Sequence, residues 1–319
     1  RPFQTECRAA ALWRDHARRT GAADSLARAD RCADSLVRTA VGDEQIAVAA
    51  VSRAQGLMLR FDLCGDPVHL DRALQTVNAV APPRKARPAA ALSAVHARIS
   101  ARRARVSGEP EALLDAAALM DVARHAGATE DVDLRMDAAM LALEAGVLQR
   151  DVRLLDQAGR DLGELVEATS PDHRPLTRAR ALALCGAGLA ALASVAGHAE
   201  AQVQGRILFD AAADQFTPDH SPLDWAAIQT LRAGDDALPM MVLVQAETLT
   251  QGQGLIVGAL ARERRGAREV ALAETLGDQA GLDTLERRLH ARMAAAAPLD
   301  WVADQLVMVE IMLARRRLG

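Results

Sequence analysis

The sequence has few aromatic residues and almost no lysine. Its 319 residues include four Phe, three Trp and no Tyr, and Lys85 is the one lysine among 38 basic residues. Because β-strands favour aromatic and β-branched residues, this composition argues against a large β-domain. Alanine instead supplies 69 residues, more than a fifth of the chain, and alanine is the best helix former. The composition therefore predicts an all-α fold.

Clustered cysteines and long apolar runs are also missing. Cys7, Cys32, Cys64 and Cys185 are widely spaced and form no C-x-x-C pair, so a structural zinc site is not indicated. We expect all four cysteines to be small buried residues. Cys7 and Cys32 are the one pair that adjacent antiparallel helices could bring together. The most apolar run, 181–196, is shorter than the roughly 18 residues of a membrane span, so no membrane span is predicted.

The charge balance does not indicate nucleic-acid binding. The formal net charge is -4, from 38 basic and 42 acidic residues, whereas a nucleic-acid-binding domain carries a basic face or stripe. Arginine runs at 262–268, 287–292 and 315–317 are interleaved with acidic residues and accompanied by few aromatics. We therefore expect solvated helix faces with i, i+4 ion pairs there. A nucleic-acid-binding regulator is kept as an alternative function.

Motifs of catalytic and cofactor sites are absent from the sequence. It contains no G-x-x-x-x-G-K-[ST], H-E-x-x-H or G-x-S-x-G pattern. Gly252-Gln253-Gly254 lacks the preceding strand of a dinucleotide site. The Pro-Asp-His corners at 171–173 and 218–220 are interpreted as repeated turns, because equivalent corners of stacked helices lie too far apart to share one metal ion. No enzyme, cofactor or metal is predicted; an enzyme whose site assembles from distant residues is the alternative.

Internal similarity recurs about every 40 to 47 residues along most of the chain. Three short turns are each followed by an apolar residue, an aspartate and a small residue, at Asp71, Asp115 and Asp156. A second element, P-D-H-x-P-L, begins at Pro171 and again at Pro218. A repeat of this length predicts stacked supersecondary units rather than one compact core.

Each period holds two predicted helices. Residues 89–105 and 111–125 both carry apolar residues at i, i+3 and i+4, and a Ser-Gly-Glu-Pro break separates them at 107–110. The same pattern predicts about 13 or 14 helices. Residues 251–258 contain three glycines, and the sequence does not decide between one long helix and two helices with a loop there. The predicted organisation is an N-terminal helical cap at 1–42 and a repeat array at 43–319, with units at 43–86, 87–130, 131–174, 175–220 and 221–319.

The sequence P-L-D-W marks two helix starts. At the first, Ser221 suits the N-cap, Pro222 suits the first helical position, and Asp224 falls in the first turn, where a carboxylate faces the positive end of the helix dipole. At the second, Ala297 replaces the capping serine before Pro298, so this start should be weaker. We expect the tryptophan of each copy to pack on neighbouring helices.

These helix pairs resemble tetratricopeptide (TPR) repeats. The P-L-D-W-A-x-x-Q start and its preceding helix, at 199–229, are similar to repeats in TPR proteins of GC-rich alphaproteobacteria, and 298–313 matches less fully. The resemblance implies a right-handed superhelical array of antiparallel helix pairs, a TPR-like α-solenoid. It also implies a noncatalytic, cofactor-free bacterial scaffold or adaptor that binds a partner protein in a concave groove. A cytoplasmic protein is expected, with a periplasmic one as the alternative if a signal once preceded Arg1.

Arginines at helical spacing are the candidate binding residues. Arg98, Arg102 and Arg105 lie at i, i+4 and i+7 of the first helix of one pair, so they share a face. Arg53 and Arg60 have a similar spacing one unit earlier. Since first helices line the groove in the TPR resemblance, the hypothesis is a groove that binds an acidic peptide by bidentate hydrogen bonds. A solvated convex face is the alternative.

The last predicted helix, 299–318, is strongly apolar on one side. Val302, Leu306, Val309 and Leu313 follow helical spacing there. This side is predicted either to cap the array or to form a homodimer contact.

Overall fold

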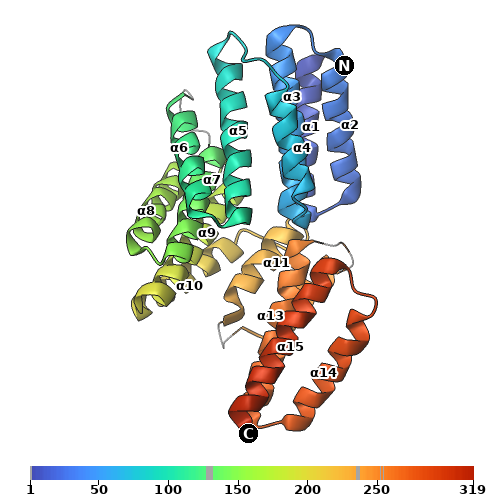
Figure 1. Ribbon diagram of the computed structural model, residues 1–319, viewed down its shortest axis with the longest axis vertical. Coiled ribbons are helices and arrows are strands. Elements are labelled where there is room, and N and C mark those ends of the chain that lie inside the picture. The colour runs from blue at the N-terminus through green and yellow to red at the C-terminus, as the bar shows by residue number, and fades with distance from the viewer. Residues whose placement is uncertain (1, 127–131, 235–237, 252, 254) are drawn as a thin grey trace. The chain divides into compact units, whose positions relative to one another are not determined.

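The computed structural model describes residues 2–126, 132–234, 238–251, 253 and 255–319. These residues form 15 α-helices and one short 3-10 helix, and no strand occurs among them (Figure 1). The predicted all-α fold is confirmed. One helix ends at Thr250 and the next begins at Ile256, where the sequence also allowed one long helix. Gly252 and Gly254, between them in sequence, lie outside the described residues.

The chain divides into two compact units. The N-terminal unit comprises Arg1–Arg18 and Ala22–Gln215, and the C-terminal unit comprises Arg19–Gly21 and Phe216–Gly319. The boundary thus falls inside residues 43–319, which we predicted as one array. Each unit is described by itself below.

The N-terminal unit is a series of helix pairs. Its helices are α1 (Phe3–Thr20), α2 (Ala23–Thr39), α3 (Gly42–Cys64), α4 (Val68–Asn78), α5 (Ala86–Ser107), α6 (Pro110–Ala126), α7 (Val132–Gln149), α8 (Val152–Ala168), α9 (Pro175–Ala196) and α10 (Ala199–Ala213). From α3 onward, the two helices of each pair contact each other, and the first helices α3, α5, α7 and α9 each contact the next in the series. Each second helix from α2 to α8 also contacts the first helix of the following pair. This is the packing expected of a helical-repeat protein.

The C-terminal unit has the same order of contacts. Its helices are α11 (Pro222–Leu231), the 3-10 helix η1 (Arg232–Gly234), α12 (Met240–Thr250), α13 (Ile256–Leu276), α14 (Gln279–Met293) and α15 (Pro298–Leu318). The first helices α11, α13 and α15 contact one another in series, and α12 and α14 are the second helices. Helix α13 therefore has neighbours on several sides, whereas α15 contacts α13 and α14.

The helix starts differ from the prediction in one detail. Ser221 occupies the N-cap position of α11, but its side chain caps no backbone N–H. Instead its buried hydroxyl shares a 2.9 Å hydrogen bond with the ring Nδ1 of His220. Both tryptophans were expected to pack on neighbouring helices, and the structure separates them. Trp225 packs against the buried alanines of α11, α12 and α13, whereas Trp301 on α15 is 47% exposed.

Small residues allow the closest helix crossings. A Cβ added to Gly186 on α9 would lie 3.0 Å from the carbonyl oxygen of Gly205 on α10, and one added to Gly266 on α13 would lie 2.6 Å from a methyl group of Val307 on α15. Contacts this short leave no room for another carbon atom. Glycine therefore has a structural role at these two crossings.

Candidate functional site

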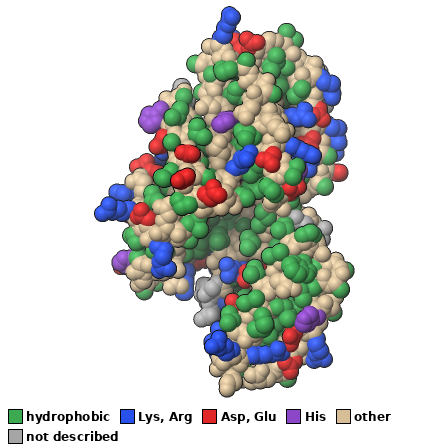
Figure 2. Space-filling model, viewed as in Figure 1, with side chains coloured by type: hydrophobic (Ala, Val, Ile, Leu, Met, Phe, Trp, Pro, Cys, Tyr) green, Lys and Arg blue, Asp and Glu red, His purple; other side chains and the backbone are tan. Residues whose placement is uncertain are grey.

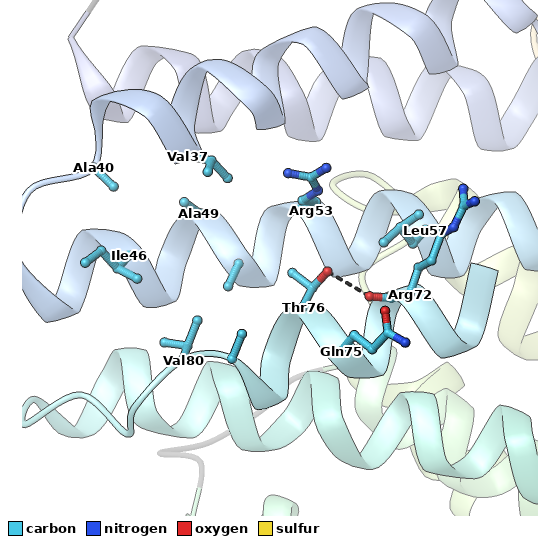
Figure 3. Close-up of a pocket in the computed structure, with 12 residues that line it drawn as sticks. Val37, Ala40, Ile46, Ala49, Arg53, Leu57, Arg72, Gln75, Thr76 and Val80 are labelled. Atoms are coloured by element: carbon cyan, nitrogen blue, oxygen red, sulfur yellow. Dashed lines mark hydrogen bonds between the residues drawn. The ribbon is translucent and has the colours of Figure 1, made fainter. Parts of the chain in front are cut away.

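The candidate site is a groove of about 510 Å³ in the N-terminal unit (Figure 3). Helix α3 forms its floor, and α2 and α4 contribute its two sides. Figure 3 shows Ile46 and Val80 toward one end and Arg53, Leu57 and Arg72 toward the other. The stretch of α3 from Ile46 to Leu57 gives the groove a length of about 16 Å.

The groove follows from the size of the side chains on α3. Ala49 and Ala50 are 2% and 5% exposed and form a low floor, because a methyl group fills little of the space between α2 and α4. Val37 on α2 and Ile46 on α3 stand higher at the rim and are 46% and 44% exposed. The result is an apolar surface that is open to solvent.

A short turn places α4 beside α3. Gly65 ends α3 in the left-handed conformation, with a φ of 75°, which glycine adopts without steric cost. The side chain of Asp66 then accepts a 3.0 Å hydrogen bond from the backbone N–H of Val68 at the start of α4. These features reverse the chain sharply, so that α4 returns along α3 and brings Arg72 to the groove.

The two arginines at the groove are weakly neutralised. The Nη1 atom of Arg53 lies 3.6 Å from a carboxylate oxygen of Asp34, and both side chains are 48% exposed. The guanidinium of Arg72 has no hydrogen bond or ion pair with the described residues; the Thr76 hydroxyl donates a 2.8 Å hydrogen bond to the backbone carbonyl of Arg72 and not to its side chain. An apolar groove with available cations suits a ligand that is apolar along its length and anionic at one end.

A second groove, in the C-terminal unit, has a different charge balance. It measures about 490 Å³ and is lined by residues of α13 and α14, including Leu272 and Leu276. Its basic residue, Arg288, already forms an ion pair with Glu269 in the same lining. Because this groove offers no uncompensated cation comparable to Arg72, the groove on α3 is the stronger candidate.

The predicted arginines do not form one open face. Arg53 reaches the groove on α3, whereas Arg60 pairs with Asp30 on α2. Arg98, Arg102 and Arg105 of α5 pair with acidic residues of neighbouring first helices. Each of the three is thus paired with a carboxylate of the same chain, and the structure gives them a packing role.

Arg102 is the centre of this arrangement. It is 6% exposed and forms a bidentate pair with Asp62 on α3, at 2.8 and 2.9 Å, and a further bond of 2.8 Å with Asp137 on α7. Burial by itself raises the pKa of the Asp137 carboxyl, but Arg102 and Arg98 outweigh burial and hold this pKa below its ordinary value. One guanidinium therefore joins three consecutive first helices.

Arg14 connects α1 to α3 without a carboxylate in its hydrogen bonds. Its guanidinium donates to the Ser52 hydroxyl at 2.9 Å and to the Gln55 side-chain oxygen at 2.8 Å. Both partners are neutral, so burial dominates and lowers the pKa of Arg14 to about 10. No sequence pattern had singled out this residue.

The C-terminal unit contains an equivalent cluster around Asp304 of α15. This side chain is fully buried and accepts a bidentate pair from Arg262 on α13, at 2.8 and 2.7 Å, and further bonds from Arg292 on α14. Burial raises the pKa of Asp304, but its hydrogen bonds to the two arginines outweigh burial and lower it. The predicted solvated face is therefore wrong for Arg262, which is 8% exposed.

A sequence signal for these clusters existed. Asp133 and Asp137 near the start of α7, and Asp300 and Asp304 near the start of α15, share the pattern D-x-x-x-D. The bonded arginine and aspartate lie 35 to 42 residues apart in sequence, close to the repeat period. An acidic residue one period from a basic one could thus have indicated a bridge between adjacent first helices.

The cysteines and the Pro-Asp-His corners are the remaining places where the sequence raised a disulfide or a metal site. All four cysteines are free, and Cys7 packs against the core cluster that contains Cys32. Burial raises the pKa of the Cys7 and Cys185 thiols. Among the described residues, no group of three or more His, Cys, Asp or Glu side chains is placed to hold a metal ion.

Helix α9 is the one described helix that is long and apolar enough to cross a membrane by length and composition. The helix begins at Pro175, six residues before the apolar run 181–196, which by itself is too short for a membrane span. Within the N-terminal unit, α9 packs between α8 and α10. The expectation of no membrane span stays a prediction.

Comparison with known proteins gives no relative. No protein-family model matches the chain, and neither a curated protein nor a solved structure matches it. The TPR resemblance accordingly stays a prediction, and function is argued from the geometry alone.

Proposed function

We propose that the protein is a noncatalytic protein-interaction scaffold of the TPR type, and that the groove on α3 binds a helical segment of a partner protein. The observation that carries this proposal is the combination of an apolar groove with the free guanidinium of Arg72. In the proposed fold the helix pairs wind into a right-handed superhelix. The proposed partner site lies on the first helix α3, between the second helices α2 and α4, and of the arginines that the sequence suggested it includes Arg53.

The dimensions of the groove fit an amphipathic helix. A length of about 16 Å corresponds to about three helical turns. An amphipathic helix would place its apolar residues at i, i+3, i+4 and i+7 against Ala49 and Ala50, with Val37 and Ile46 along its sides. The small floor residues let such a helix approach α3 closely.

The charges define which end of the partner segment is recognised. Arg72 has no acidic partner among the described residues, and Arg53 has only the 3.6 Å pair with Asp34. A carboxylate on the ligand can form charge-assisted hydrogen bonds with both guanidiniums. The partner segment is therefore expected to be apolar with an aspartate, a glutamate or a C-terminal carboxylate at one end.

A displayed peptide library tests the proposal while the partner is unidentified. Random peptides of about 12–16 residues are selected on the full chain, and enriched peptides are titrated by fluorescence anisotropy. We expect apolar residues at helical spacing and an acidic residue near one end. Arg53→Glu combined with Arg72→Glu should weaken binding of these acidic peptides by about 10-fold or more.

Position-specific controls locate the binding. Ile46→Asp should abolish it because it puts a charge on the apolar rim, whereas Leu114→Asp, on an exposed residue of α6 outside the groove, should leave it unchanged. Failure to enrich any peptide, or peptides whose affinity is the same for wild type and Ile46→Asp, would count against the proposal.

A further inference from the structure

Helix α15 carries an unpartnered apolar stripe on the surface of the C-terminal unit. Six large side chains make it up: Trp301, Val302, Leu306, Val309, Met312 and Leu313, each between 42% and 57% exposed. At 3.6 residues per turn they fall within an arc of about 140°. Figure 2 shows hydrophobic side chains at the surface around this helix. Four of the six are the residues for which the sequence left a cap or a dimer contact open.

The stripe is separate from the face by which α15 joins its own unit. Ala303, Val307, Ile311 and Ala314 are at most 3% exposed, and the last three pack in a core cluster with residues of α13 and α14. The internal face is thus satisfied, and the stripe is an additional apolar surface. Gln305 lies within the same arc but is half-buried, and its side-chain amide donates to Met293 Sδ. Exposed apolar surface of this kind marks interaction sites in soluble proteins.

The ends of the stripe are chemically complementary to each other. Trp301 lies at its N-terminal end, and Arg316 lies at its C-terminal end within the same arc. Arg316 is exposed and has no hydrogen bond or ion pair with the described residues. An arginine guanidinium binds favourably over the face of an indole ring. A surface with a ring at one end and a free guanidinium at the other can pair with itself when one copy is reversed.

We propose that α15 is a homodimerisation helix, whose stripe packs antiparallel against the stripe of a second copy of this chain. A two-fold axis midway between Trp301 and Arg316 falls at Met308 and Val309. It sets Trp301 of each copy opposite Arg316 of the other, and it brings the two Val309 side chains together. Parallel pairing would instead place the two Arg316 guanidiniums side by side, so their repulsion selects the antiparallel arrangement.

The two-fold pairing has a consequence for the scaffold. An isologous interface buries the same patch on both copies and closes at two, so the assembly stops at a dimer. A dimer would carry two α3 grooves, and a partner with two binding segments would be held by avidity. The dimer itself does not depend on the proposed function of the groove.

Sedimentation velocity on the full chain tests the pairing. Wild type should shift with concentration from the 33.9 kDa monomer to a species of twice that mass. Val309→Asp, which places two carboxylates at the axis, should raise the dimer dissociation constant by about 100-fold. Arg316→Glu should raise it by about 5- to 10-fold. The matched control Val122→Asp, on an exposed valine of α6, should have no effect.

A cysteine at the axis gives a second measurement that does not require dissociation. Under mild oxidation, Val309→Cys should form more disulfide-linked dimer than the parent chain, which has four native thiols of its own. Val122→Cys should form no more than the parent chain. The proposal is overturned if wild type stays monomeric up to the hundred-micromolar range. It is also overturned if a dimer persists unchanged in folded Val309→Asp, or if Arg316→Glu dimerises like wild type and the Val309→Cys variant does not cross-link.

Discussion

In the N-terminal unit, the guanidinium of Arg102 lies between two carboxylates, Asp62 and Asp137. In the C-terminal unit, the carboxylate of Asp304 lies between two guanidiniums, Arg262 and Arg292. Both clusters join helices that are adjacent in space, and both are buried at the centre. The sign of the central charge is the difference between them.

That difference decides what remains when the central group is removed. Without Arg102, Asp62 is already 38% exposed to water and Asp137 keeps Arg98 as a partner. Without Asp304, Arg262 remains with a side chain that is only 9% exposed, and its one remaining ion pair among the described residues, with Asp300, is long at 3.6 Å. An uncompensated buried charge costs more than an exposed one, so the C-terminal cluster should be the more sensitive of the two.

The largest effect is expected for Asp304→Ala. Leaving two arginines without their carboxylate should lower the free energy of unfolding of the C-terminal unit by about 3–5 kcal/mol. Hydrogen exchange read by mass spectrometry can assign the loss to this unit. Asp300→Ala, on the same helix with a 22% exposed side chain, is the matched control and should cost about 1 kcal/mol or less. Equal losses for the two variants would remove the special role of Asp304.

Acid should weaken both clusters in the same direction. Because the folded-state pKa values of Asp137 and Asp304 are lowered, the unfolded chain binds protons first as the pH falls. Their stabilisation is therefore fully present above the ordinary Asp pKa of about 3.9 and is lost as the pH falls below it through the folded-state values.

Denaturant unfolding across a pH series, read separately for each unit by hydrogen exchange, measures this dependence. Asp304→Asn should flatten the acid response of the C-terminal unit and leave that of the N-terminal unit unchanged. An unchanged acid response of the C-terminal unit in Asp304→Asn would show that other groups control it.

A smaller loss is expected for Arg102→Met. The apolar replacement removes the bridge between first helices but leaves Asp62 hydrated and Asp137 paired, so the N-terminal unit should lose about 1–3 kcal/mol. The neighbouring Arg103→Met removes a half-exposed pair with Asp71 and should change stability by about 0.5 kcal/mol or less. If Arg102→Met cost more than Asp304→Ala, the contrast between the clusters would be reversed.

The smallest effects concern two glycines in helices, and they should have opposite signs. Gly266→Ala forces a methyl group against Val307, and the overpacking should cost the C-terminal unit about 1 kcal/mol net. Gly159→Ala on α8 meets open space and should stabilise the N-terminal unit by about 0.5–1 kcal/mol through helix propensity. Thermal unfolding of both variants measures the two changes, and a gain for Gly266→Ala would contradict the close crossing.

Local sequence was sufficient for the helices. The periodicity at 89–105 and 111–125 predicted two helices, and the structure has α5 and α6 there, longer by one to three residues at each end. Gly108, which lies in the predicted break, ends α5 in the left-handed conformation. These features depend on neighbours within a few residues, which the sequence displays directly.

The binding hypothesis rested on spacing, which identifies a shared helix face but not what covers that face. Arg98, Arg102 and Arg105 were correctly placed on one helix, yet their partners Asp137 and Glu144 come from another first helix almost 40 residues later. The rim residues of the groove carried no signal, since exposed apolar residues such as Val37 look like core residues in sequence.

By itself, the sequence determined that the chain is helical, since its alanine content and apolar periodicity act over single turns. The tertiary structure alone decided which arginines form buried ion pairs and which guanidinium stays unpaired at the α3 groove. It also decided which side of α15 is left exposed. Those outcomes depend on which helices become neighbours, and the free energy of a charge or an apolar side chain depends on what surrounds it. That surrounding is supplied by residues about one repeat away in the chain.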